Sequence, residues 1–132
     1  MMRKQEDREV NLTADCGNSP KNILLKDFTI AFARGHAEFV LERVSDHLVW
    51  MDTGMQGQKG LDDLKAELIK KQTGRMVKMV LSHVLSHGKA GAVDGIFQLA
   101  NGRQHVFCGI FEFASAKADR ISRIKSYVVS VG

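Results

Sequence analysis

The chain has 132 residues, of which 44% are hydrophobic and 26% charged, and its formal net charge is +4. This length and balance predict one soluble globular domain, and no apolar run reaches the roughly 18 residues that a membrane-spanning helix needs. Lysine and arginine are spread along the chain and interleaved with acids, whereas a nucleic-acid site needs them clustered. We therefore expect neither a nucleic-acid nor a membrane partner.

Residues 1–18 are polar and lack the apolar stretch of a signal peptide, which predicts a cytoplasmic protein with a flexible N-terminal segment. Residues 19–132 are expected to form the single domain. Cys16 lies in the polar segment and Cys108 in an apolar one, so the two do not make a disulfide framework. Both are predicted to be free thiols in a reducing compartment.

Helices are predicted in three places in the first half of the chain. Ser19 and Pro20 are typical of a helix start, and Gly35 of a helix end. A shorter apolar stripe with helical spacing covers 37–44. A third helix begins at Leu61, with acids in its first turn and lysines in its last. Before it, HLVWMD at 47–52 predicts a short strand, and a glycine-rich turn follows that strand.

The second half predicts long strands joined by tight polar turns, with a hairpin at Asn101-Gly102. Residues 76–87 fit a helical stripe as well as a strand. We predict a strand there because the segments after them pair naturally as hairpins. The strand at 106–113 is apolar on both faces, which indicates that both are covered. We expect helices on one face and a second copy of the chain on the other, in a homodimer through the outer sheet face.

Four passages carry a resemblance to a known superfamily, and they are FARGHAEFVLERVSDHLVWMDTG, HGKAGAVDG, NGRQHVFCGIFEF and DRISRIKSYVV. They resemble the nuclear transport factor 2-like (NTF2-like) superfamily, and within it the SnoaL-like proteins, over about residues 20–130. The resemblance implies an α+β fold, a cone-shaped, cystatin-like roll with three N-terminal helices packed on a curved, mainly antiparallel sheet. It also implies a strand at 76–87. The superfamily includes isomerases, cyclases, hydrolases and non-catalytic dimerisation modules, so the fold alone implies little about function.

The ketosteroid isomerases of that superfamily have a pattern that this chain lacks. Their chemistry needs a carboxylate base at the end of the first strand, a tyrosine on the first helix and a protonated acid on a late strand. The corresponding positions fall on Met51, on Phe28, and on Gly109 or Phe111. We therefore do not expect ketosteroid isomerase chemistry of that kind.

Asp52 is the candidate general base. It follows an apolar strand at the expected mouth of the pocket, where burial would raise the pKa of its carboxyl. The plainer interpretation, an acid that caps the turn after the strand, is favoured by the residues alone. Trp50 shares the parity of Asp52 and is expected to be a pocket wall or a dimer contact.

His83 and His87 form an HxxxH pattern, which on a helix could be half of a metal site. On a strand they would stand about 13 Å apart, so one metal could not use both. We predict no metal and no cofactor, and interpret the histidines as pocket or interface residues. A nucleophilic set of His105, Cys108 and Asp94 is also conceivable, but a buried, inert cysteine is the usual case.

The predicted function is binding of a small hydrophobic molecule in a mostly apolar conical pocket. If the protein is an enzyme, Asp52 with His83 as its partner would transfer protons in an isomerase, cyclase or hydrolase. Tyr127 is expected first to satisfy its hydroxyl within the protein and second to contact the ligand. The alternative is a non-catalytic homodimerising interaction module, whose cavity would be filled by Phe and Met. The predicted ligand-binding residues are Phe28, Phe32, Trp50, His87, Phe111 and Tyr127.

Overall fold

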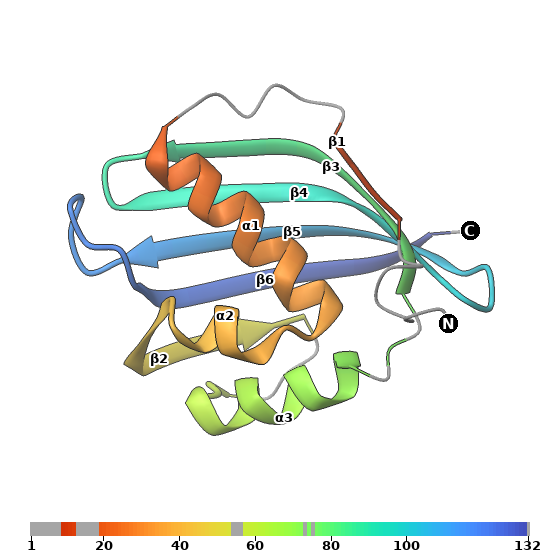
Figure 1. Cartoon of the computed structure of the whole chain (residues 1–132), viewed down its shortest axis with the longest axis horizontal. Coiled ribbons are helices and arrows are strands. Elements are labelled where there is room, and N and C mark those ends of the chain that lie inside the picture. Colours follow the sequence, from red (N-terminus) through yellow and green to blue (C-terminus); the bar gives the residue numbers. More distant parts are fainter. Residues whose placement is uncertain (1–8, 13–18, 54–56, 73, 75, 132) are drawn as a thin grey trace.

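The computed structural model describes residues 9–12, 19–53, 57–72, 74 and 76–131 (Figure 1). The elements in chain order are β1 (Glu9–Leu12), α1 (Pro20–Arg34), α2 (Ala37–Leu41), β2 (Val44–Asp52), α3 (Leu61–Gln72), β3 (Met76–His87), β4 (Ala90–Leu99), β5 (Gln104–Phe113) and β6 (Ile121–Val131). The strands form one sheet in the order β1-β3-β4-β5-β6-β2. Strands β3 to β6 are antiparallel neighbours, while β1 and β2 pair in parallel at the two edges. The predicted α+β class and mainly antiparallel sheet are confirmed.

The first helix begins and ends where its sequence signals predict. Ser19 accepts a hydrogen bond from the Asn22 N–H at 3.0 Å, which satisfies one of the free donors at the start of α1. Gly35 follows the helix with φ of 73°, a left-handed conformation that costs little in glycine.

The second helix is shorter than its apolar stripe indicates. It ends at Leu41, and Val44 already belongs to β2, where it pairs with Ile121 of β6. Both side chains are buried, so packing between strands decided the conformation of a residue that fits either pattern.

The ambiguous segment 76–87 is the strand β3, as predicted. It pairs with β4 along its whole length, with register shifts between Met76 and Lys78 and between Leu81 and His83. The hairpin at Asn101-Gly102 is also confirmed. It joins β4 to β5, and Gly102 has φ of 89°.

The N-terminal segment departs from the expectation of a flexible tail at Glu9–Leu12, which form β1. This strand pairs in parallel with β3, so that Val10 lies opposite Met79 and Asn11 opposite Val80. The physical reason is that β3 would otherwise be an open edge, whose free N–H and C=O groups are a template for a further strand. The other residues of 1–18, Cys16 among them, lie outside the described residues.

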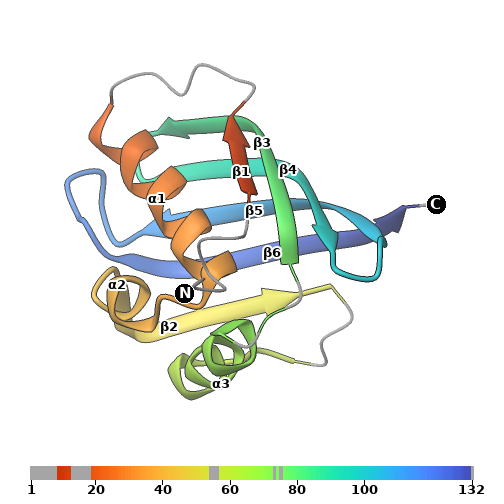
Figure 2. The ribbon, with the colours of Figure 1, turned by 45° about the vertical axis from the view of Figure 1, so that its right-hand side comes forward.

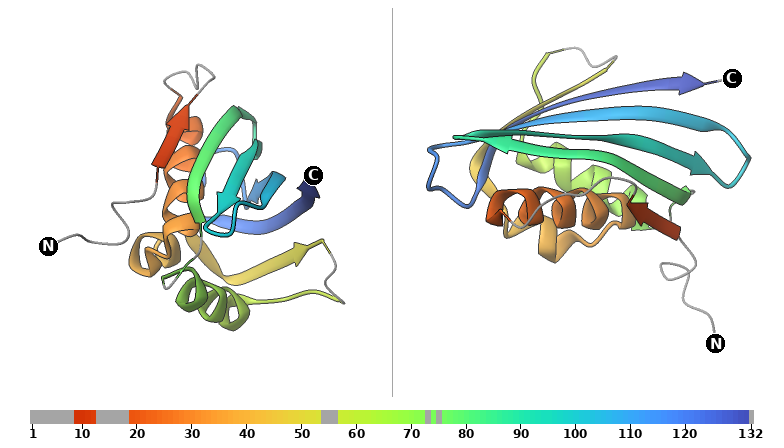
Figure 3. Two further views of the ribbon diagram at one scale, coloured as in Figure 1. Left: turned by 90° about the vertical axis from the view of Figure 1, so that its right-hand side faces the viewer. Right: turned by 90° about the horizontal axis from the view of Figure 1, so that it is seen from above.

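The helices lie on one side of the sheet, and no helix of the described residues covers the other side (Figures 2 and 3). The core lies between the helices and the inner sheet face, with Leu25, Leu64, Leu68, Leu81 and Phe113 almost completely buried. Among the described helices, none is long and apolar enough to cross a membrane.

Candidate functional site

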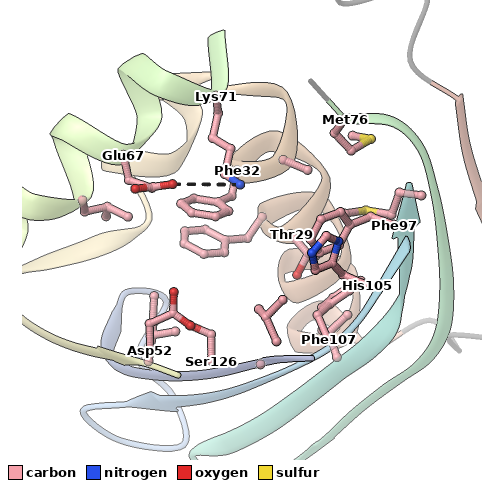
Figure 4. Close-up of a pocket in the computed structure, with 18 of the residues that line it drawn as sticks. Thr29, Phe32, Asp52, Glu67, Lys71, Met76, Phe97, His105, Phe107 and Ser126 are labelled. Carbon is pink, nitrogen blue, oxygen red and sulfur yellow. Dashed lines mark ion pairs between the residues drawn. The ribbon is translucent and has the colours of Figure 1, made fainter. Parts of the chain in front are cut away.

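A cavity of about 700 Å³ lies between α1, α3 and the inner face of the sheet (Figure 4). Its size is within the range of sites for small organic molecules. Most of its wall is aromatic or aliphatic, and the aromatic side chains come from α1 and from three strands. They are Phe28, Phe32, Trp50, Phe97, Phe107 and Phe111.

Strand alternation decides which residues reach this cavity. On β5, Phe107, Gly109 and Phe111 point inward, because successive side chains of a strand point to opposite faces. The register carries the same face onto β6, where Val128 lies opposite Phe107 and Ser126 opposite Gly109. The two strands together form the floor of the cavity.

The aromatic walls are held by packing against one another. Phe28 meets Phe111 edge to face at 5.8 Å between ring centroids, and Phe32 meets Trp50 at 6.5 Å. Such edge-to-face pairs are a favourable geometry for aromatic rings. Gly109 provides the room for this arrangement, because a Cβ there would lie 3.0 Å from the Phe111 ring. The predicted wall residues Phe28, Phe32, Trp50 and Phe111 therefore all line the cavity.

Asp52 also lines the cavity, at the end of β2, and its side chain is half-buried. Its Oδ1 accepts a hydrogen bond from the Thr53 N–H at 2.8 Å, which is the turn-capping role. A carboxylate can accept several further hydrogen bonds, so this contact leaves Asp52 able to bind a group inside the cavity.

Further polar side chains of the cavity wall lie near Asp52 and on α3. Trp50 Nε1 donates to Ser126 Oγ at 3.1 Å, so both groups are paired within the protein. On α3, Lys71 forms an ion pair with Glu67 at 4.0 Å, and its Nζ lies 5.5 Å from the centroid of the Phe32 ring. The sequence gives no signal that these charged residues line a cavity, because helical charges usually face solvent.

His105 is the cavity residue that sequence reasoning assigned to a different set. It lies at the start of β5, and its ring stacks on Phe97 with 5.0 Å between centroids and 8° between planes. Figure 4 shows it beside Thr29 and Phe97, on the other side of the cavity from Asp52 and Ser126. Its only signal in the sequence is its position, since His105 is an even number of residues from Phe107 and Phe111 and therefore shares their face of the strand.

Three predicted site residues, His83, His87 and Tyr127, are not among the residues that line this cavity. His83 and Tyr127 lie on the outer sheet face, where His83 Nδ1 is 2.8 Å from Asp94 Oδ1 and the Tyr127 side chain is exposed. His87 ends β3 next to the exposed turn. The register shift after Leu81 brings His83 opposite Asp94. Asp94 lies opposite Cys108, which lies opposite Tyr127, so these residues form one row across the sheet on its outer face.

Cys108 is a free, half-buried thiol on the outer face. Burial raises the pKa of this thiol, and the negative charge of Asp94 raises it further. Nucleophilic cysteines need the opposite, a lowered pKa. Because His105 lies on the inner face and Cys108 on the outer, the His105, Cys108 and Asp94 set is not assembled. Within the described ranges, no three His, Cys, Asp or Glu residues are grouped as a metal site would require.

The class that this geometry defines is an α+β sheet with helices on one face and a ligand-sized cavity between them. Solved structures of NTF2-like proteins have a similar fold. One is an NTF2-like protein of unknown function from Cytophaga hutchinsonii, 12% identical, with a TM-score of 0.63 over 86% of this chain and 93% of that one.

Two further solved structures carry functional names. A candidate ketosteroid isomerase from Kribbella flavida is 14% identical, with a TM-score of 0.68 over 85% of this chain and 79% of that one. A candidate isomerase of the SnoaL-like family from Agrobacterium tumefaciens is 13% identical, with a TM-score of 0.63 over 84% and 99%. No protein-family model and no curated protein matches the sequence. The comparisons therefore show the NTF2-like fold, and at these identities they show the fold alone.

Proposed function

We propose that this protein binds a small, mostly apolar molecule in the cavity between α1, α3 and the sheet. The observation that carries the proposal is that the cavity is open, has a volume of about 700 Å³, and has a mostly apolar wall that also carries a few polar side chains. An interaction module would have no reason to keep such a space, since empty apolar volume costs stability. Here Gly109 and the aromatic walls keep the space open. The conical shape of the pocket, implied by the resemblance, stays a prediction.

Within this proposal, Asp52 is the group that takes a proton from a bound substrate, in an isomerase, cyclase or hydrolase. Its support is its place on the wall of a cavity that aromatic side chains also line. A carboxylate that lies within reach of a bound molecule can act as a general base toward it. His83 lies on the outer face and cannot be the partner of Asp52 in proton transfer. We propose that a group on the ligand itself has that role.

The binding proposal can be tested with N-phenyl-1-naphthylamine, a neutral apolar dye that fluoresces when it leaves water. Two neighbouring residues of β6 offer a matched pair, because Val128 lines the cavity and Val129 is 58% exposed on the outer face. We expect the wild type to bind the dye and Val128→Phe to weaken binding at least about tenfold by filling the space. Val129→Phe should bind as the wild type does. Equal binding by all three proteins, or none, would contradict the cavity proposal.

A homodimer is a second proposal, and the outer sheet face supports it. Apolar side chains that no described element covers lie there on neighbouring strands, and they include Leu85, Ile96, Val106, Tyr127 and Val129. Exposed apolar side chains gathered on one face are typical of a protein contact. Binding in the cavity and pairing of two copies use opposite faces of the sheet, so the two proposals are compatible.

A further inference from the structure

His105 has an unsatisfied hydrogen-bonding group inside the cavity wall. Its Nδ1 is buried and has no hydrogen-bond partner among the described residues. A buried polar atom without a partner costs about 1–3 kcal/mol, and nearly all such atoms in native proteins have one. The other polar groups deep in the cavity differ, because Trp50 Nε1 is paired with Ser126 and Thr29 donates to the Leu25 carbonyl.

The ring is fixed in its orientation by the strand below it and by Phe97. Stacking at 5.0 Å and 8° holds the imidazole plane, with Phe107 next to Phe97 at 6.0 Å. A phenylalanine would stack there equally well, so packing does not by itself require a histidine. What distinguishes histidine is that its ring can donate a hydrogen bond in the neutral and in the charged form.

His105 is too far from Asp52 to act as its hydrogen-bond partner. Asp52 lies opposite Ser126 and His105 opposite Ser130, so they are four residues apart along β6 and on its two sides. That corresponds to about 13 Å along the strands and about 10 Å across them, or roughly 16 Å between the two backbones. Each residue therefore meets a different end of a molecule in the cavity.

We propose that His105 is a specificity-determining residue that donates a hydrogen bond to an oxygen at one end of an otherwise apolar ligand. The ligand class is a hydrophobic ring system with a hydrogen-bond acceptor at the His105 end and its apolar body between Phe28, Phe32 and Trp50. This inference rests on the proposed function, because it needs a ligand in the cavity. Asp52 cannot replace His105 in this role, since an ionised carboxylate only accepts hydrogen bonds.

The test compares two probes that differ by one oxygen, tetralin and 1-tetralone, by isothermal titration calorimetry. For His105→Phe we expect the dissociation constant of 1-tetralone to rise roughly three- to tenfold, the size of one net hydrogen bond, while that of tetralin changes less than about twofold. Unchanged tetralin binding also shows that the variant is folded. His105→Leu should behave in the same way and replaces the first variant if phenylalanine does not fit.

Two control variants isolate the contribution of the His105 ring. His87→Phe makes the same chemical change outside the cavity and should bind both probes as the wild type does. Lys71→Met removes a cationic donor of α3 that also lines the cavity, and it should keep the wild-type ratio of the two dissociation constants. If His105→Phe keeps that ratio, or if Lys71→Met alone loses it, the inference is wrong. If the wild type binds neither probe, the cavity proposal itself fails, which is a different result.

Discussion

Asp52 shows at the scale of one residue how a structural and a chemical role can coincide. Its Oδ1 holds the turn at Thr53, and the same carboxylate lies on the wall of an aromatic cavity. The sequence predicted both roles but could not show that they are compatible, because a turn cap needs only local contacts. A cavity wall needs α1, α3 and β6 in place.

The base role of Asp52 predicts catalysis of a simple proton abstraction. With 5-nitrobenzisoxazole, a base takes the C3 proton, the N–O bond breaks and a coloured cyanophenolate forms. We expect the wild type to accelerate this reaction over buffer and Asp52→Asn to lose at least about tenfold of the rate, since a positioned base contributes about 10²–10⁴-fold.

The matched control is Glu112→Gln, which removes a carboxylate that pairs with Arg123 outside the cavity. It should keep the wild-type rate, measured by absorbance of the phenolate. An Asp52→Asn protein that binds N-phenyl-1-naphthylamine normally and keeps its full rate would show that Asp52 is a turn cap only.

The other site residues show what parity can and cannot predict. Phe111 and His105 share an inward face that alternation along β5 could have indicated. His83 could not be placed in this way, because the register shift after Leu81 depends on how β3 pairs with β4. The exposure of Tyr127 likewise follows from the pairing of β5 with β6, and pairing between strands is a property of the folded sheet.

At the scale of elements, Gly95 indicates how closely β3 and β4 approach. It lies opposite Leu81, at the register shift of this strand pair. A Cβ at Gly95 would lie 2.1 Å from the Val80 carbonyl oxygen, which is backbone and cannot rotate away. The sequence predicted the hairpin, but this contact exists only because the strand pair is irregular at that point.

Gly95→Ala is therefore expected to destabilise the protein by about 1–3 kcal/mol, the usual cost of overpacking, or by more if the pairing shifts. Urea unfolding followed by Trp50 fluorescence measures it, because Trp50 is the single tryptophan and is buried. Gly60→Ala is the comparison, since its Cβ would meet only the Leu48 carbonyl at 3.9 Å. It should cost less than about 1 kcal/mol. Equal costs would mean that β4 moves freely away from β3.

Local signals predicted most of the elements, and distant pairings explain the differences. Ser19, Pro20 and Gly35 act on their own neighbours, so α1 has the predicted ends. The second helix is shorter because Val44 pairs with Ile121, which lies far away in the sequence. Strand β1 has a similar explanation, since its four alternating residues, EVNL, are too short a pattern to predict a strand and its partner is the distant edge of β3.

At the scale of the whole molecule, the exposed outer face predicts a dimer of two 14.7 kDa chains. Val129→Lys places a charge on this face, and burying an unpaired charge in a contact is costly. We expect sedimentation equilibrium to show a wild-type dimer, and a variant whose dimer dissociates at least about tenfold more easily. Ile69→Lys makes the same change on α3, where Ile69 is 64% exposed, and should leave the dimer intact. A wild-type monomer at all concentrations would contradict the prediction.

The two faces of strand β5 belong to two different proposed contacts, the cavity on one side and the partner chain on the other. His105 and Phe107 face the cavity, while Val106 and Cys108, their chain neighbours, face outward. The evolutionary consequence is that β5 has few positions where substitutions are free of selection. In related chains that keep both roles, accepted changes along it should alternate with period two, one series following the ligand and the other following the partner chain. A lineage that lost one role would keep only one of these two series.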